Sequence, residues 1–230
     1  MSRVLTLARH DARLQFRYGI YVAYAFVVGF YVFMLTSAAP YLPSWAVGVI
    51  IYSDPAGLGF FFLGALMMLE KAERVRTALA TAPVSSAEYF AAKVMTLSSV
   101  SLIACGALLI VVHSAPNPAL LLAAVALTSI MFIGIGVPVA LRFRTVNGYL
   151  VGAGALLTPV IAPAGLALLE PLPNWLLIWP PVAQFRLILI ATGYGTASLG
   201  EVVLMLAVCF AAAAAASWFA IETLKTELGK

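Results

Sequence analysis

Charged residues are scarce in this chain. Asp, Glu, Lys and Arg make up 10% of its 230 residues, whereas 63% are hydrophobic and the mean hydropathy is +1.05. Soluble domains have about 25% charged and about 45–50% apolar residues, so this composition excludes a soluble protein and predicts one that is dissolved in lipid. At about 20 residues for each spanning helix, the chain has room for six spans joined by short connections. We therefore expect residues 1–230 to form one all-α integral membrane domain.

Residues with catalytic or metal-binding chemistry are equally scarce. The sequence has two histidines and two cysteines. Cys105 and Cys209 both lie inside apolar runs, where packing is the expected use rather than a disulfide or a metal site. His113 stands apart from any Cys, Asp or Glu, which is typical of a helix boundary. No phosphate-binding loop and no Ser/His/Asp set is present. The chain is therefore predicted to be no enzyme, to hold no metal or cofactor, and to be unable to hydrolyse ATP.

Positive charges are present, with a net charge of +4, but they gather on one predicted side. The bases stand beside the ends of apolar runs and form no basic groove with aromatics, so they indicate membrane topology and not a nucleic-acid partner. Only Arg186 is predicted to lie on the opposite side. The positive-inside rule makes the crowded side cytoplasmic, with both termini on it. Its bases are Arg3, Arg9, Arg13, Arg17, Lys71, Arg74, Arg76, Lys93, Arg142, Arg144, Lys225 and Lys230.

The apolar runs predict spans at residues 18–36, 46–69, 90–112, 119–141, 149–169 and 199–221. Glycine and proline in the fourth run are expected to let helices approach closely and to soften the helix near its inner end. In the fifth run they serve either packing or the moving wall of a pathway. The stretch 170–198 is too long for a turn and too broken by proline for a span, and it fits a re-entrant helical segment in the outer leaflet. A short helix over 182–192 would carry Arg186, which we expect to pair with Glu170 or Glu201 or to meet lipid headgroups.

The longest polar interruption covers residues 69–93. Glu70 with Arg74 stands at i,i+4 and Glu73 with Arg76 at i,i+3, both with the acid first, which is the favourable order on a helix. Helix-forming residues surround these pairs. The pattern therefore predicts a short polar helix between the second and third spans, exposed to water. A loop that merely stays soluble explains the same pattern equally well.

A turn and a second helix follow this polar helix. Pro83 is expected to end the first helix. Ser85, with Glu88 three residues later, is a capping box that begins the next one. Lys93 then lies close enough to the predicted membrane surface to extend its ammonium group to water. The whole segment is thus predicted as helix, turn, helix on the membrane face.

The pattern E-K-x-E-x-x-x-x-A-L-x-x-x-P-V-S-x-x-E-Y-x-x-x-K over residues 70–93 resembles the cytoplasmic loop of ABC-2 type permeases, the membrane subunits of type V ABC exporters. Residues 54–65 are also similar to permeases of fluoroquinolone export. The resemblance implies that the loop, residues 70–88, holds a coupling helix that docks on an ATP-binding subunit, which carries ATP and Mg. It further implies a second permease copy or a paralogue. The coupling residues would be Glu70, Lys71, Glu73, Arg74, Arg76 and Leu79, with Pro83, Ser85 and Glu88 in the turn and cap.

Residues 2–17 predict a different kind of helix. Its bases share one arc and its apolar residues the other, which is typical of an amphipathic helix lying on the anionic inner leaflet and contacting its lipids. Asp11 falls on the apolar side and does not fit. The helix serves as an anchor or, as the resemblance implies, also packs near the ATPase. The members of the basic arc are Arg3, Arg9, His10, Arg13 and Arg17.

One carboxylate, Asp54, stands in the middle of the second apolar run. An ionised side chain at that depth costs about 2.5–3.5 kcal/mol, so it requires a partner, water or a role. Ser53-Asp54-Pro55 has the pattern of an N-cap followed by proline at the first helical position, which favours a cap. A contact with substrate or with a proton is the alternative. The candidate pathway residues are Asp54, Tyr24, Phe60 and Arg186.

Two functions from different classes fit these observations. The first is the permease subunit of an ATP-driven exporter in a bacterial-type inner (plasma) membrane, which the resemblance implies and whose substrate would be an amphipathic drug or a lipid-like molecule. The second is a membrane scaffold or receptor subunit that transports nothing. An ATPase that accompanies the chain would distinguish the first from the second.

Overall fold

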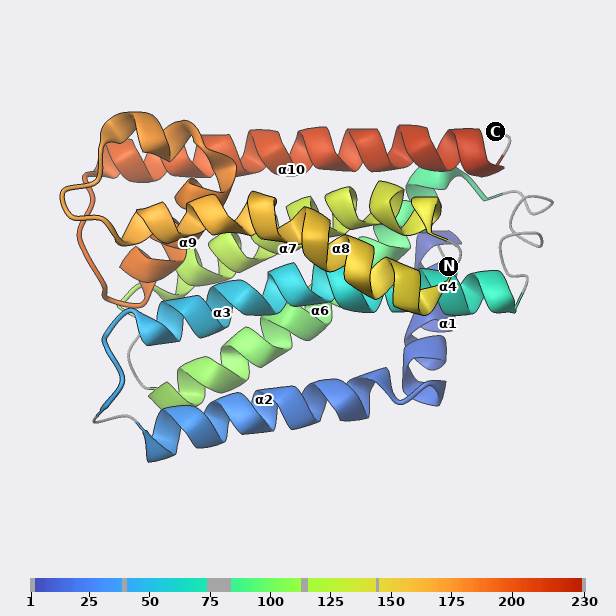
Figure 1. Cartoon of the computed structure of the whole chain (residues 1–230), viewed down its shortest axis with the longest axis horizontal. Coiled ribbons are helices and arrows are strands. Elements are labelled where there is room, and N and C mark those ends of the chain that lie inside the picture. The colour runs from blue at the N-terminus through green and yellow to red at the C-terminus, as the bar shows by residue number, and fades with distance from the viewer. Residues whose placement is uncertain (1–2, 39–40, 74–83, 113–115, 144, 229–230) are drawn as a thin grey trace.

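The computed structural model describes residues 3–38, 41–73, 84–112, 116–143 and 145–228, and these residues form helices and connections without a strand (Figure 1). The all-α prediction is confirmed. In chain order the elements are α1 (Arg3–Arg17), α2 (Ile20–Ser37), α3 (Ala46–Gly57), the π turn η2 (Leu58–Phe62), α4 (Leu63–Ala72), α6 (Ser86–Val112), α7 (Pro118–Arg142), α8 (Val146–Ile161), the 3-10 turns η3 (Ala162–Leu168) and η4 (Asn174–Ile178), α9 (Pro180–Ala191) and α10 (Leu199–Leu228).

Helices long and apolar enough to cross a membrane number six among the described residues, as the sequence predicts. The third helix begins at Ser86, where the predicted capping box at Ser85 starts it, and so extends beyond the apolar run that begins near residue 90. The fifth is α-helical only to Ile161 and continues as a 3-10 turn, next to Pro163. The six segments are Ile20–Ser37, Ala46–Lys71, Ser86–Ile110, Pro118–Arg142, Val146–Leu168 and Leu199–Glu227.

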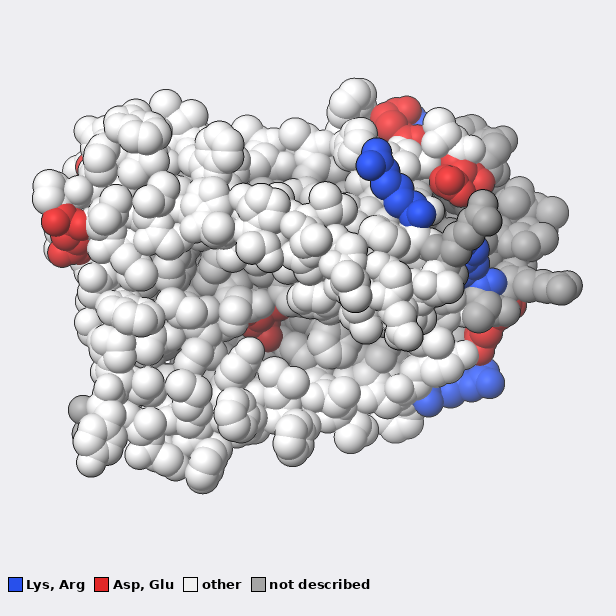
Figure 2. Space-filling view, viewed as in Figure 1, with Lys and Arg blue, Asp and Glu red and all other residues white. Residues whose placement is uncertain are grey.

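Helix α1 lies across one end of the bundle (Figure 1), and the members of its basic arc are exposed. It ends at Arg17, and Gly19 then takes a positive φ of 69°, a conformation that glycine adopts without steric cost and that turns the chain into α2. Leu14 and Ala8 are buried, and α1 packs mainly on α6. The end of α10 lies at this same end of the bundle (Figure 1), which we call the basic end because Lys and Arg gather there in Figure 2.

Helix α7 is the centre of the packing. It contacts α10, α6, α9, η2, α3 and α4. Glycine allows close approaches: a Cβ on Gly136 would stand 2.2 Å from the Gly59 carbonyl oxygen in η2, and one on Gly134 would stand 2.7 Å from the backbone carbon of Ala216 in α10. Such small residues let membrane helices approach each other directly. The glycines of the fourth span therefore serve the close helix packing that the sequence predicts.

The second span is continuous through Asp54, so the interpretation of this residue as a helix cap is wrong. Helix α3 begins at Ala46 and contains Pro55 in its interior. The interruption comes later, at the π turn η2, which disturbs the regular backbone hydrogen bonds. There the Tyr149 hydroxyl donates to the Phe60 carbonyl. Proline is tolerated inside membrane helices when neighbouring groups satisfy the backbone, which is why the local cap pattern does not decide the structure.

Helix α9 lies within the bundle at the end opposite α1 (Figure 1), and most of its side chains are buried. It confirms the short helix predicted over 182–192. Its 12 residues extend about 18 Å at 1.5 Å per residue, which is shorter than the hydrocarbon core of about 30 Å. The re-entrant arrangement itself remains a prediction.

Candidate functional site

A lysine forms the centre of a buried ionic cluster at the basic end. Lys93, near the start of α6, is 2% exposed, and its Nζ donates hydrogen bonds to Asp11 Oδ1 of α1 and to Glu70 Oε1 of α4. The two carboxylates are also buried, at 4% and 3% exposure. One cation thus joins three helices that are far apart in the sequence. We call Asp11, Lys93 and Glu70 the ionic triad.

The carboxylate oxygens of the triad that do not meet Lys93 have partners of their own. Asp11 Oδ2 accepts from Gln15 Nε2 at 3.1 Å and from Thr96 Oγ1 at 2.6 Å, and Glu70 Oε2 accepts from the Tyr89 hydroxyl. The Tyr89 ring also lies 5.2 Å from the Lys93 ammonium, within cation–π range. A buried polar network in which each carboxylate oxygen has a partner holds its members in one arrangement.

The triad ties α1, α4 and α6 to one another. Two carboxylates share a single ammonium, and removing the ammonium would leave two buried carboxylates without a counter-charge, which is strongly destabilising. Movement of α4 therefore has to move α6 and α1 with it or break this network. In the part of the chain that the structure describes, no group of histidine, cysteine or carboxylate side chains could hold a metal ion.

A second polar cluster lies halfway along the bundle. Asp54 in α3 is 8% exposed and accepts hydrogen bonds from the Tyr24 hydroxyl of α2 and from Ser101 Oγ of α6, the latter at 2.7 Å. Tyr24 also lines a largely apolar cavity of about 460 Å³ between α2 and α6. The structure thus supplies the partners that a carboxylate at membrane depth requires, and it places them beside a space open to a ligand.

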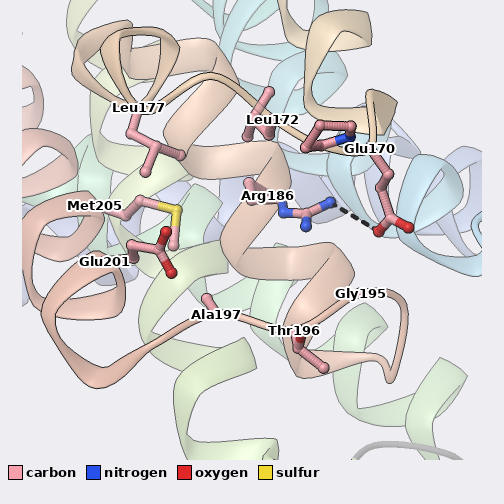
Figure 3. A pocket seen from close by; sticks show the side chains of 10 residues that line it. Glu170, Leu172, Leu177, Arg186, Gly195, Thr196, Ala197, Glu201 and Met205 are labelled. Carbon is pink, nitrogen blue, oxygen red and sulfur yellow. Dashed lines mark hydrogen bonds and ion pairs between the residues drawn. The ribbon is translucent and has the colours of Figure 1, made fainter.

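A third polar site lies at the end opposite the triad, where a cavity of about 470 Å³ opens between α9, the loop after η3 and the start of α10 (Figure 3). Arg186 of α9 is 7% exposed, and its Nη1 donates to the Ala167 carbonyl at 3.1 Å and lies 3.5 Å from Glu170 Oε1. Of the alternatives predicted for Arg186, the structure shows the pair with Glu170. Figure 3 shows the guanidinium between Glu170 on one side and Glu201 on the other.

Comparison with known proteins identifies the family of the chain. The model of the fluoroquinolones export permease protein family matches residues 2–225. The chain belongs to this family. It is 27% identical over 206 residues to the fluoroquinolones export permease proteins of two Mycobacterium tuberculosis strains, CDC 1551 / Oshkosh and H37Rv, covering 86% of this chain and 84% of each relative. No solved structure matches it.

The resemblance to permeases of fluoroquinolone export is therefore confirmed, and it covers the chain and not only residues 54–93. Together with the six apolar helices, family membership makes the chain a multi-pass membrane protein of the permease type. Export permeases are not themselves enzymes, in agreement with the scarcity of catalytic groups in the sequence.

Two side chains of this permease differ from their predicted environments. Glu70 was expected on a water-exposed helix but is buried in the triad, and Lys93 was expected to extend to water but points inward. Both differences have the same cause, since the Glu70 carboxylate and the Lys93 ammonium pair with each other inside the protein. Sequence reasoning missed the third member, Asp11, although its position on the apolar arc of α1 is the sign of a buried charge.

The other predicted coupling residues of the permease are only partly described. Lys71 is exposed, and Glu73 accepts a hydrogen bond from Tyr18 and lies 3.9 Å from Arg17. The hydrogen bond to Glu73 raises the pKa of the Tyr18 hydroxyl. Four further members of the predicted coupling segment, which lie outside the described residues, are Arg74, Arg76, Leu79 and Pro83.

The predicted capping box is present. Glu88 Oε2 accepts from the Ser85 backbone N–H at 2.8 Å, and the Glu88 N–H donates to Ser85 Oγ at 3.2 Å. Phe60, in contrast, is fully buried and packs edge-to-face on Phe132. It lines neither the Tyr24 cavity nor the Arg186 cavity, so its place in the structure is the core.

Proposed function

We propose that this chain is the membrane-spanning permease subunit of an ATP-driven exporter of the ABC-2 type in a bacterial-type inner membrane. Family membership and the six apolar helices support a transporter. The gathering of bases beside α1 and the end of α10 supports cytoplasmic termini through the positive-inside rule (Figure 2). The basic end is then the cytoplasmic end, and the Arg186 cavity lies on the outer side.

The observation that carries the proposal is the ionic triad. Glu70 is placed where the second span meets the predicted coupling segment, residues 70–88, and Lys93 lies just after that segment, at the start of the third span. A force on the coupling segment would act at once on the second span, through Glu70, and on the third span, through Lys93. Through Asp11 the same force would reach α1. The network is thus placed to convert movement of a docked partner into movement of the spans.

The energy would come from a second protein. The sequence has no phosphate-binding loop, so ATP and Mg would be bound by separate ATPase subunits that grip the coupling segment of two permease chains, either two copies or one copy and a paralogue. Since Glu70 is buried, the surface of contact would be formed by its neighbours. These are Lys71, Glu73, Arg74, Arg76 and Leu79.

The substrate would be an amphipathic drug or a lipid-like molecule. The relatives from Mycobacterium tuberculosis are named for fluoroquinolones, which makes this drug class the first to test. The cavity beside Tyr24, whose hydroxyl donates to Asp54, has an apolar wall and a volume within the range of ligand sites, about 300–1,000 Å³. It offers a lateral entry for a molecule that is already dissolved in the membrane.

The test is to purify the chain from its native membrane in mild detergent and to identify its companions by mass spectrometry. We expect an ATPase in near one-to-one ratio. Reversing the charges of the predicted surface, with Glu73→Lys, Arg74→Glu and Arg76→Glu together, should remove the ATPase while the chain still inserts into the membrane. Arg142→Glu, an exposed base at the same end but in α7, is the matched control and should retain it.

Two results would contradict this function. One is repeated isolation of the chain alone in good yield, which would favour a membrane scaffold or receptor. The other is an ATPase that accompanies the triple variant as well as it accompanies the native chain, which would show that the complex does not depend on the coupling segment.

A further inference from the structure

The cavity at the outer end has the chemistry of a binding site for a zwitterion. Its walls come from α9, the loop after η3 and the start of α10 (Figure 3). Its volume of about 470 Å³ is within the range of small-molecule sites. Part of the wall is apolar and part is charged. The residues that line it are Glu170, Pro171, Leu172, Leu177, Arg186, Gly195, Thr196, Ala197, Glu201 and Met205.

The guanidinium group of Arg186 uses only some of its hydrogen-bond donors. A guanidinium has five N–H donors in a planar fork. Within the described part of the chain, only Nη1 of Arg186 has partners, the Ala167 carbonyl at 3.1 Å and Glu170 at 3.5 Å. Nη2 lies beside Gly195, where a Cβ would stand 2.9 Å away, so the absence of a side chain there keeps this edge of the guanidinium open. A buried guanidinium with free donors favours a carboxylate or a phosphate as its ligand.

Glu201 supplies the opposite charge across the cavity. Its Oε2 accepts from the Ser198 N–H at 2.7 Å and from Ser198 Oγ at 3.0 Å, which fixes the side chain at the start of α10. Its Oε1 has no hydrogen-bond partner among the described residues. Glu170 is half-exposed at the opposite rim. Leu177 and Met205 form apolar wall beside Glu201 (Figure 3).

We propose that this cavity binds a zwitterionic amphiphile, with its anionic group on Arg186 and its ammonium group on Glu201. The apolar body would lie against Leu177 and Met205. Both a soluble zwitterion and the headgroup of phosphatidylethanolamine have this chemistry. A role for the site in release of an exported molecule rests on the proposed function, whereas binding itself requires neither the ATPase nor transport.

The experiment measures binding to the full chain in micelles of dodecyl maltoside, an uncharged detergent that does not share the charges of the proposed ligand. The soluble probe is a fluoroquinolone with a free carboxylate and a piperazine ammonium, followed by its intrinsic fluorescence and compared with its methyl ester and its N-acetyl derivative. On the native chain the ester should bind at least about tenfold more weakly, since it loses a charge-assisted hydrogen bond. The N-acetyl derivative should bind several-fold more weakly. Because these comparisons use only the native chain, misfolding of a variant cannot explain their results.

Variants then assign each end of the probe. Arg186→Gln should weaken binding of the zwitterion to the level of the ester and leave the ester unchanged. Glu201→Gln should weaken the zwitterion but not the N-acetyl derivative. Arg142→Gln, at the other end of the molecule, is the matched control and should change nothing.

A lipid arm distinguishes the two sources. Chain purified from nanodiscs that contain phosphatidylethanolamine is examined by native mass spectrometry, and a lipid retained by the native chain but lost in Arg186→Gln supports the headgroup as occupant. Equal binding of acid and ester, together with no retained lipid that depends on Arg186, would overturn the proposal. Loss of the ATPase in the copurification test would affect the exporter function alone, so the two failures are distinguishable.

Discussion

The two ends of the bundle hold a buried cation in opposite ways. At the basic end, Lys93 lies between Asp11 and Glu70, both of them buried, and each carboxylate oxygen has a partner. At the other end, Arg186 meets a single acid, Glu170, whose side chain is 53% exposed, and the guanidinium borders a cavity. The first arrangement is closed and the second is open. A closed network ties helices together, whereas an open one leaves donors for a ligand.

This difference has an energetic consequence. When a buried ion pair loses one partner, the charge that remains is far from water. At the basic end the remaining charge would be a buried carboxylate, whereas at the outer end it would be Glu170, which water already reaches. The same type of substitution should therefore have a larger effect at the basic end.

The largest effect is expected for Lys93→Met. It removes the ammonium and leaves Asp11 and Glu70 facing each other in a buried site, so we expect the free energy of unfolding in bicelles, measured by steric trapping, to fall by about 3–5 kcal/mol. The triple variant Lys93→Met, Asp11→Asn, Glu70→Gln removes the charges together and should recover most of this loss. A triple variant as unstable as Lys93→Met would show that packing, and not charge, explains the effect.

The next comparison concerns the close contact between α7 and α10 at Gly134. Gly134→Ala places a Cβ 2.7 Å from the backbone of Ala216 and forces α7 and α10 apart, which should lower the free energy of unfolding by about 1–3 kcal/mol. Gly154→Ala is the control, because a Cβ there meets no atom within 4 Å. Equal stability of the two variants would mean that α7 and α10 separate without cost.

Arg186→Met should have a smaller effect than Lys93→Met. It removes the hydrogen bond to Ala167 and the pair with Glu170, but the acid can turn to water, so we expect a loss of about 1–2 kcal/mol in the same assay. A loss as large as that of Lys93→Met would contradict the contrast between a closed and an open site.

The smallest effects are expected at two similar caps, where the ends should behave alike. Ser85 with Glu88 caps α6 at the basic end, and Ser198 with Glu201 caps α10 at the outer end, with nearly identical distances. Ser85→Ala and Ser198→Ala should each lower the midpoint of thermal unfolding in detergent by an amount equivalent to about 1 kcal/mol. A clear inequality between them would show that the ends differ in more than their buried cations.

The spans and caps could be predicted because their signals are local. Hydropathy over about 20 residues predicts a spanning helix, and a capping box lies within four residues, so Ser85 with Glu88 was found correctly. The pair between Arg186 and Glu170 was also expected, since so few charges are available on that side. The spans and caps depend on neighbouring residues in the sequence, and the partner of Arg186 had to come from a small number of acids.

The buried clusters could not be derived in this way, because their members come from distant segments. Asp54 has the local pattern of a cap, yet its partners Tyr24 and Ser101 belong to other helices, which override that pattern. Asp11 and Lys93 are 82 residues apart. Their charges indicate that partners are required, but only the packing of the helices determines which ones.

The order of the triad along the chain has a consequence for biosynthesis. Translation proceeds from the N-terminus, so Asp11 and Glu70 leave the ribosome before Lys93, which follows Asp11 by 82 residues and Glu70 by 23. Asp11 lies on α1, across the end of the bundle, and Glu70 at the end of the second span (Figure 1). Both acids can therefore remain hydrated at the membrane surface until the third span is made. When that span inserts, both counter-ions of Lys93 are already present, so its ammonium group does not have to enter lipid unpaired.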